Sequence, residues 1–231
     1  MSSHWRPGRV LDGAQYRAFL FDLDGTLYDQ PQLRRRMAVE LFRWILANPF
    51  RLRQVKILSA FRKLREERRS EQKCALEAAQ YRWTAEHLGV DEAMVRRVVG
   101  EWIFSRPLKH LDACRPAGLK ELFSRLRERE IKIGVFSDYP VTEKLTTLGL
   151  RADVCACATD AAIDCFKPDP TGLKALCAML KVEPAECVHM GDRKEIDELC
   201  AQACGCESII LPAHRAKEMG REKTYDLMFG K

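Results

Sequence analysis

Apolar and polar positions follow two different rhythms along this chain. A short apolar run over residues 18–21 has the length and composition of a buried strand. It ends in the carboxylates Asp22 and Asp24 and the turn residues Gly25 and Thr26. Further on, apolar residues first recur every three or four positions, as on one face of a helix, and later return in short strand-like runs. The pattern predicts an α/β chain with a helical segment after its first strand.

Helical periodicity fills residues 31–112. The predicted helices, read from apolar spacing and from capping or breaking residues, cover residues 31–48, 50–67, 71–88 and 91–104. Pro49 interrupts the first helix because proline has no backbone N–H to donate, and Asp91 is a typical N-cap residue at the start of the last. Because no strand pattern occurs here, we predict that residues 31–112 form an all-helical domain.

Strands and helices alternate in the remainder of the chain. Predicted helices over residues 116–130, 141–148, 170–180 and 195–204 separate predicted strands over residues 131–136, 154–158, 187–190 and 207–211. This alternation favours a parallel sheet covered by helices. The predicted fold class is therefore α/β: a Rossmann-like core formed by residues 1–30 and 113–231, with an inserted all-helical cap domain.

Composition adds an expected location. The chain has 231 residues, of which 46% are hydrophobic and 31% charged, a balance typical of packed soluble proteins. No uncharged apolar run reaches the length of about 18 residues that spans a membrane, and no apolar signal-peptide core follows the N-terminus. We therefore expect a cytoplasmic protein.

The 10 cysteines do not form a disulfide pattern. Several lie within apolar runs, where free cysteine packs as a small hydrophobic residue, and a reducing cytosol keeps it free. Cys200, Cys204 and Cys206 could also be metal ligands, but they lack paired Cys-x-x-Cys spacing. Packing is the favoured interpretation.

The positive charge is concentrated in the helical segment. The whole chain carries a net charge of +6, whereas residues 31–112 contain 18 Lys and Arg against 10 Asp and Glu. Such a segment is either a solvated basic surface or a module that faces an anion. Residues 42–53 mix aromatic and basic side chains, as membrane-surface helices do, so contact with anionic lipid is a second hypothesis. No nucleic-acid partner is expected.

Polar side chains with catalytic potential stand at the ends of three predicted strands: Asp22, Ser137 and Asp192. In a parallel sheet covered by helices, ligands bind beyond the carboxyl ends of the strands, which share one edge. Two acids as close as Asp22 and Asp24 repel each other and must be paired or bind a cation. We therefore expect these side chains to belong to one site.

Each of these residues also has an ordinary structural interpretation. Asp24-Gly25 is a common hairpin turn. Ser137-Asp138 could cap the next helix, and Lys167 by itself would be expected in solvent. If these residues had no common function, all of these independent interpretations would have to be correct at once. We therefore favour a common site.

The order and types of these residues resemble the haloacid dehalogenase-like hydrolase superfamily. Its four motifs are represented by Asp22-Leu23-Asp24-Gly25-Thr26, by Ser137, by Lys167-Pro168, and by Gly191-Asp192 through Asp197. The resemblance covers about residues 17–211, and the helical domain looks like a C1 cap of that family.

The resemblance implies a role for each residue. Asp22 would be the nucleophile that forms an aspartyl-phosphate, Asp24 the general acid and then base, and Lys167 the cation beside Asp22. The implied phosphate-binding residues are Gly25, Thr26, Ser137 and Asp138. The implied Mg²⁺ ligands are Asp22, Asp24 through its backbone carbonyl, Asp192 and Asp197, the last as a ligand or as a residue that positions one.

Asp24 narrows the expected reaction. Relatives that cleave carbon–halogen bonds generally lack this second aspartate, because no leaving oxygen needs a proton. We therefore expect a Mg²⁺-dependent phosphatase that acts on a small phosphorylated metabolite, such as a sugar phosphate, phosphoglycolate or a nucleotide. A phosphomutase using the same site and a non-catalytic binding relative are the alternatives.

Overall fold

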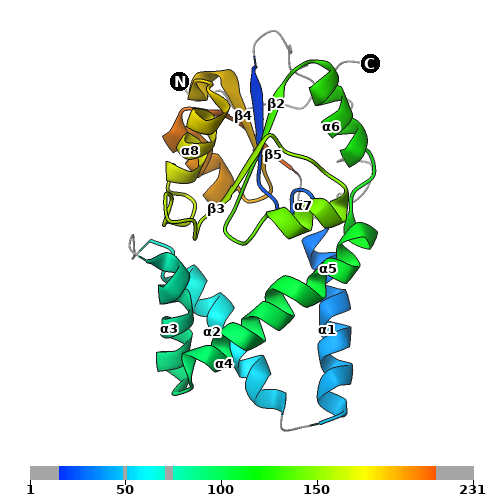
Figure 1. Cartoon of the computed structure of the whole chain (residues 1–231), viewed down its shortest axis with the longest axis vertical. Helices are drawn as coiled ribbons and strands as arrows, with labels where there is room; N and C mark the ends of the chain where they lie inside the picture. Colours follow the sequence, from blue (N-terminus) through cyan, green and yellow to red (C-terminus); the bar gives the residue numbers. More distant parts are fainter. Residues whose placement is uncertain (1–15, 49–50, 71–74, 212–231) are drawn as a thin grey trace.

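The computed structural model describes residues 16–48, 51–70 and 75–211, which form two lobes (Figure 1). One lobe is a 5-stranded parallel sheet in the order β3-β2-β1-β4-β5. The strands are β1 (Ala18–Phe21), β2 (Lys132–Ser137), β3 (Val154–Cys157), β4 (Cys187–Gly191) and β5 (Glu207–Ile210). The predicted α/β class with a parallel sheet is confirmed.

The central strand β1 brings the predicted site residues to one edge. It pairs in parallel with β2 on one side and β4 on the other, so that Phe21 lies opposite Val135 and Met190. The backbone N–H of Asp22 continues this pairing by donating to the Met190 carbonyl at 2.8 Å. The carboxyl ends of β1, β2 and β4 therefore meet at one edge of the sheet.

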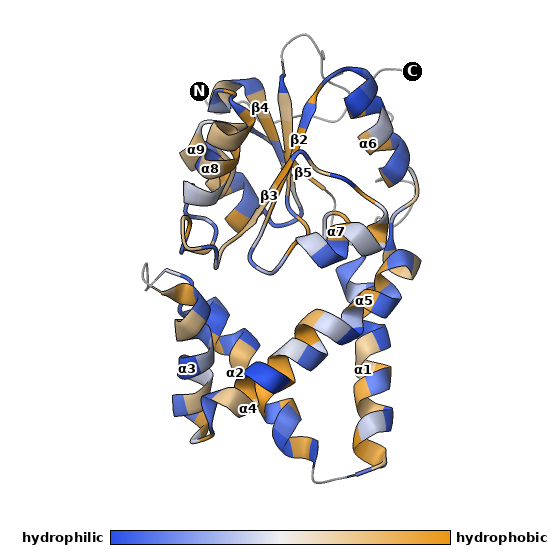
Figure 2. Cartoon of the chain, viewed as in Figure 1, coloured by the Kyte–Doolittle hydropathy of each residue, from blue (hydrophilic) through white to orange (hydrophobic). Residues whose placement is uncertain are grey.

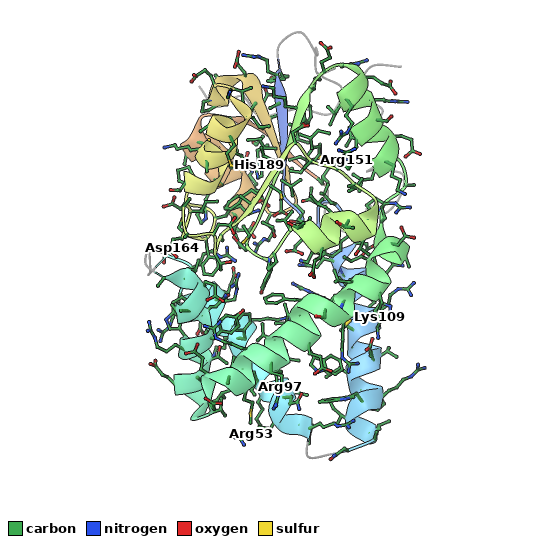
Figure 3. All side chains as sticks on the ribbon, in the orientation of Figure 1. Arg53, Arg97, Lys109, Arg151, Asp164 and His189 are labelled. Carbon is green, nitrogen blue, oxygen red and sulfur yellow. The ribbon has the colours of Figure 1, made fainter. Side chains whose placement is uncertain are left out.

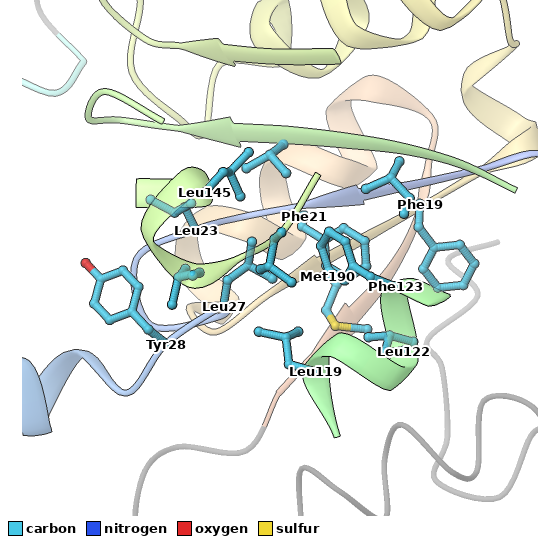
Figure 4. Packing of buried hydrophobic residues seen from close by; sticks show 14 of the residues in the cluster. Phe19, Phe21, Leu23, Leu27, Tyr28, Leu119, Leu122, Phe123, Leu145 and Met190 are labelled. Carbon is cyan, nitrogen blue, oxygen red and sulfur yellow. The ribbon is translucent and has the colours of Figure 1, made fainter. Parts of the chain in front are cut away.

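Alternate side chains of β1 enter two separate cores. Phe19 and Phe21 pack on the face covered by α6 (Leu119–Glu128) and α7 (Thr142–Leu148), where the rings of Phe21 and Phe123 stack at 5.1 Å between centroids (Figure 4). The opposite face is covered by α8 (Thr171–Leu180) and α9 (Leu199–Cys204). Burial on both faces explains why the first strand has a continuous apolar run.

The inserted helical lobe lies between β1 and β2, which confirms the predicted C1 cap. Its elements are α1 (Gln30–Leu46), α2 (Leu52–Glu67), α3 (Leu76–Leu88), α4 (Glu92–Val99), the π-helical turn η2 (Gly100–Ser105), α5 (Arg106–Leu111) and the 3-10 turn η3 (Asp112–Cys114). Apolar and polar residues are mixed along these helices (Figure 2), and the buried apolar side chains form a core of the cap in which the rings of Trp44 and Trp102 meet at 4.9 Å between centroids. The exact domain boundaries stay predictions.

One predicted helix end in the cap is wrong. The helix expected over residues 91–104 continues through η2 and α5, which together form the long diagonal rod in Figure 1. Pro107 does not end it, because this proline directly follows the π-helical turn η2, where the regular hydrogen-bond pattern of an α-helix is already interrupted. Asp91 takes the N-cap position, although its side chain makes no capping hydrogen bond.

Some predictions fall outside the described residues. These are the break at Pro49, the start of the second helix at residue 50 and the start of the third over residues 71–74. Within the described ranges, no helix has the length and apolar character needed to cross a membrane.

Candidate active site

Asp22 is held at the end of β1 by hydrogen bonds to both carboxylate oxygens. Its Oδ1 accepts from the Nζ of Lys167, and its Oδ2 accepts from the Oγ1 of Thr26 at 3.1 Å. The chain then turns sharply at Gly25, whose φ of +102° favours glycine. A Cβ there would lie only 2.2 Å from Oδ2 of Asp192, so the turn passes directly beside that carboxylate.

Lys167 joins two segments of the site from a fully buried position. Its ammonium donates to Asp22 and, at 2.7 Å, to Oδ1 of Asp197. Asp197 also accepts from the backbone N–H of Arg193 at 3.0 Å and lies 3.4 Å from Nε2 of His189. Burial lowers the pKa of Lys167, but Asp197 and Asp22 outweigh it and hold the pKa above the usual value, so the lysine stays charged.

His189 anchors this cluster from within the sheet, and our sequence interpretation missed it. The ring is completely buried at the centre of the core lobe (Figure 3), and its Nδ1 lies 3.0 Å from the Leu20 carbonyl. The sequence does indicate this residue, because His189 stands inside an apolar strand and two residues before Gly191-Asp192.

Three carboxylates converge at the carboxyl ends of β1 and β4. The oxygens of Asp22, Asp192 and Asp197 lie within 4.8 Å of one another. Burial raises the pKa of Asp22 to about 8, and Asp197 and Asp192 add to the rise, against the effect of Lys167. Carboxylate oxygens are suitable ligands for Mg²⁺, and three carboxylates offer them here within a small volume. The residues present therefore fit the magnesium site implied by the sequence.

Asp24 occupies a different environment from Asp22, although the two lie two residues apart. Its Oδ1 accepts from the Nζ of Lys144 at 2.5 Å and from the hydroxyl of Tyr28, and its Oδ2 accepts from Ser137 at 3.0 Å. Burial raises the pKa of Asp24, but Lys144, Tyr28 and Ser137 outweigh burial, and the pKa lies below its model-compound value of 3.8. The two acids are thus held by separate sets of donors.

Tyr28 and Lys144 were not among the predicted site residues. Burial raises the pKa of Tyr28 well above its usual value, and the nearby Asp24 raises it further, so the phenol stays protonated and donates. Tyr28 follows Asp24 by four residues, whereas Lys144 lies on α7, far away in sequence. Lys144 reaches Asp24 only because α7 packs beside the turn at Gly25 that follows β1.

Ser137 and Asp138 play different parts at the end of β2. Ser137 donates to Asp24 and accepts from the backbone N–H of Tyr139 at 3.1 Å, and it does not cap α7, whose N-cap position is Val141. The Asp138 carboxylate accepts from Arg69 of the cap at 2.5 Å. A carboxylate has no donor to offer a phosphate, and this one is already bound to Arg69. The predicted phosphate-binding role of Asp138 would therefore rest on its backbone N–H alone.

Arg65 of α2 and Arg69, which lies just beyond the end of α2, fasten the cap to this edge of the core. Arg69 also donates to the Lys167 carbonyl at 2.9 Å, and the buried Arg65 donates to the Asp138 carbonyl at 2.6 Å. Asp164 of the core accepts from the backbone N–H groups of Ala75 and Leu76 at 2.7 and 2.6 Å, at the start of α3 (Figure 3). Part of the predicted basic surface therefore binds the core instead of facing solvent.

Sequence comparison gives a family-level match over most of the chain. The model of the haloacid dehalogenase-like hydrolase family matches residues 16–205. The mouse (Mus musculus) haloacid dehalogenase-like hydrolase domain-containing protein 3 is 34% identical over 87 residues, which is 37% of this chain and 35% of that protein. The match therefore spans little more than a third of that relative.

Structural comparison finds capped proteins of the same architecture. The 2-haloacid dehalogenase from Pseudomonas syringae pv. Tomato DC3000 aligns with a TM-score of 0.61 at 21% identity, covering 88% of each chain. The β-phosphoglucomutase from Clostridium difficile aligns with a TM-score of 0.60 at 16% identity, covering 90% of this chain and 88% of that one. At these identities the likeness shows the shared fold.

Proposed function

The chain belongs to the haloacid dehalogenase-like hydrolases, and from this premise we propose that it is a Mg²⁺-dependent phosphatase acting on a small phosphate monoester. The observation that carries the proposal is the division of labour between the two aspartates. Asp22 lies among acids and beside Lys167, whereas Asp24 lies apart from that cluster, at the cleft between core and cap. A nucleophile and a separate proton donor are what phosphate ester cleavage requires.

In the first half of the proposed reaction, a carboxylate oxygen of Asp22 attacks phosphorus and the bond to the leaving oxygen breaks. Lys167 and the hydroxyl of Thr26 hold that carboxylate in place. Bound Mg²⁺ would be held by Asp22, Asp192, Asp197 and the Asp24 carbonyl, and would supply the positive charge that lets an anionic nucleophile approach a phosphate dianion. Asp24 gives its proton to the leaving oxygen.

In the second half, Asp24 takes a proton from water, and that water attacks the aspartyl-phosphate to release inorganic phosphate and restore Asp22. Lys144, Tyr28 and Ser137 hold the Asp24 carboxylate in place for both steps. They also favour its ionised form, so the proton that it donates must be acquired when the phosphate dianion binds beside it.

Two other reactions are possible on this fold. A dehalogenase needs no proton donor for a halide, so Asp24 and its three donors favour a phosphate substrate. A phosphomutase would pass the phosphoryl group to a second hydroxyl, and product analysis separates release of inorganic phosphate from an isomerised sugar phosphate. A non-catalytic relative would show no metal-dependent turnover at all.

Asp24→Asn tests the proton-donor role through the leaving group. For an alkyl phosphate, whose leaving alkoxide needs a proton, we expect kcat/KM to fall by about 10²–10⁴-fold. For p-nitrophenyl phosphate the fall should be much smaller, because nitrophenolate leaves without protonation and kcat/KM reports only the steps up to its departure. An equal loss on both substrates would contradict a general-acid role for Asp24.

The cytoplasmic location and the lipid contact of the cap stay predictions. Phe42, Leu46 and Leu52 expose apolar side chains on the described part of the cap segment, next to its basic residues. Sedimentation with vesicles that contain or lack anionic lipid measures whether this segment binds a membrane; equal recovery removes the idea.

A further inference from the structure

A cleft of about 340 Å³ lies between the cap and the core, beside Asp24. Asp24, Tyr28, Tyr139 and Lys144 form its core side. Most of the cap side is apolar, and its apolar lining residues are Leu33, Met37, Ala38, Leu41, Val55, Leu58, Trp102, Ile103 and Pro107. Since Asp24 would protonate the leaving oxygen, this cleft is where the leaving group of the substrate would lie.

Arg34 from α1 and Arg62 from α2 also line the cleft, and they lack acidic partners there. Among the described residues neither guanidinium makes a hydrogen bond or an ion pair, and both residues are exposed. Burial lowers the pKa of Arg62, and the charge of Arg34 lowers it further. Two like charges are thus held close together without a counterion.

The acid in the cleft wall does not balance these arginines. Of the residues that line the cleft in the described ranges, Asp24 alone is acidic, and Lys144 already donates to its carboxylate at 2.5 Å. The transferred phosphate would be held beside Asp22 by Gly25, Thr26, Ser137 and Lys167. Asp22, Lys167 and Ser137 are not among the residues that line the cleft, so the two arginines lie away from the reacting group.

We propose that Arg34 and Arg62 bind a second anionic group of the substrate. The substrate class is then a phosphate monoester whose leaving group has an apolar or aromatic body and carries a carboxylate or another phosphate. This inference rests on the proposed phosphatase function and adds to it the recognition of the leaving group. Arginine suits the task because its planar guanidinium binds carboxylates and phosphates through two parallel hydrogen bonds.

The matched substrates for a test are phenyl phosphate and its 3- and 4-carboxylated derivatives, which share the reacting group and the aromatic body. The wild-type enzyme should favour a carboxylated ester in kcat/KM. Arg62→Met and Arg34→Met should each lower kcat/KM for that ester by about tenfold to a hundredfold, mainly through KM, and leave phenyl phosphate nearly unchanged. Arg53→Met is the control, since Arg53 is exposed on the same helix and lies outside the cleft lining (Figure 3).

Different failures have different meanings. If the wild-type enzyme shows no preference for the carboxylated esters, or if the arginine variants lose both kinds of substrate equally, the second-anion site is wrong. If no aryl phosphate is turned over with Mg²⁺ present, or if Asp22→Asn turns one over at the wild-type rate, the phosphatase proposal itself fails.

An independent cluster of thiols lies at the opposite end of the sheet. Cys177 on α8, Cys187 at the start of β4 and Cys206 before β5 place their sulfur atoms within 4.8 Å of one another. The sulfurs of Cys177 and Cys187 are 3.7 Å apart, and the Cys204 thiol interacts with those of Cys177 and Cys206. All four side chains are buried, and all four cysteines are free.

The cysteines of this cluster differ from the set Cys200, Cys204 and Cys206 that the sequence suggested. Cys200, which shares helical spacing with Cys204, donates to the Asp169 carbonyl at 3.4 Å. Cys177 and Cys187 take part instead, because α8 and β4 pack together in the core. Sequence spacing gave no sign of this grouping.

We infer that the four thiols form a structural site for a thiophilic cation, with Zn²⁺ as the expected occupant. A tetrahedral site with Zn–S bonds of about 2.3 Å separates its sulfurs by about 3.8 Å. The Cys177–Cys187 separation of 3.7 Å already matches that edge. Thiolates select zinc over the hard cations that carboxylates bind, and each coordinating thiol releases its proton to solvent on binding.

Elemental analysis of the protein purified under reducing conditions from zinc-supplemented cells should find about one Zn²⁺ per chain. Cys187→Ser should lose it, whereas Cys114→Ser, a buried cysteine in the other core, should keep it. Protein from cobalt-supplemented cells should show the near-ultraviolet absorption of cobalt–thiolate bonds, which does not depend on a variant folding. Wild-type protein without zinc and without that absorption, or with Cys177 and Cys187 joined as a disulfide, overturns the site.

Discussion

Replacing Asp22 by Asn is expected to abolish turnover of p-nitrophenyl phosphate, with kcat falling by about 10⁴-fold or more. The amide cannot form the aspartyl-phosphate, and it removes one of three converging carboxylates. Because a low-pKa leaving group does not need a proton from Asp24, kcat/KM for this substrate isolates the nucleophilic step. The measurement is steady-state release of p-nitrophenolate with Mg²⁺ present, with Asp24→Asn as the comparison.

The fold of this variant should remain intact. Burial raises the pKa of Asp22 to about 8, so at neutral pH and without metal the ionised carboxylate is less stable in the folded protein than in the unfolded chain. An uncharged amide avoids that cost, and the melting temperature in metal-free buffer should stay at or above the wild-type value. Wild-type turnover by Asp22→Asn would exclude Asp22 as the nucleophile.

Replacing Lys167 by Met should damage both activity and stability. The side chain is 1% exposed and neutralises Asp22 and Asp197, so its removal leaves buried carboxylates without their cation. Breaking a buried ion pair from one side costs about 3–5 kcal/mol of unfolding free energy. We also expect kcat to fall by about 10³-fold, in the range of losses seen when an electrostatic stabiliser is removed.

Denaturant unfolding with and without Mg²⁺ measures this effect. Magnesium should recover more stability in Lys167→Met than in the wild-type protein, because the metal then supplies the positive charge that the lysine provided. Lys174→Met on the exposed side of α8 is the matched control and should leave both quantities unchanged. A Lys167→Met protein as stable and active as wild type would remove the lysine from the proposed site.

The strands and the acids at their ends follow from local sequence, because each apolar run directly precedes its polar residue. Asp22, Ser137 and Asp192 were therefore placed correctly at the ends of β1, β2 and β4. Lys144 and His189 were missed because tertiary packing sets their partners Asp24 and Leu20, whereas Tyr28 was missed although it lies only four residues from its partner Asp24. Lys144 is typical: on sequence alone it is a lysine near the start of a short helix, and only tertiary structure places it 2.5 Å from Asp24.

The cap was harder to predict than the core for a related reason. Helical periodicity identifies an apolar face, but it does not say whether a charged face meets solvent, a cleft or another domain. Arg65 and Arg69 were grouped with a basic surface, yet both bind the core. The extension of the helix past Pro107 was missed because a proline within a helical pattern usually predicts the end of the helix.

The arginine side of α2 also limits how this cap could be exchanged with that of a relative. Arg62 lines the cleft, while Arg65 and Arg69, one and two turns further on, bind the core. Adding or deleting one residue within α2, before Arg62, would rotate Arg62 and Arg65 by about 100° around the helix axis and displace Arg69, so docking and substrate contact would be lost together. A cap transplanted from another chain would need to keep the register of α2, whereas the length of the link between α1 and α2 could vary.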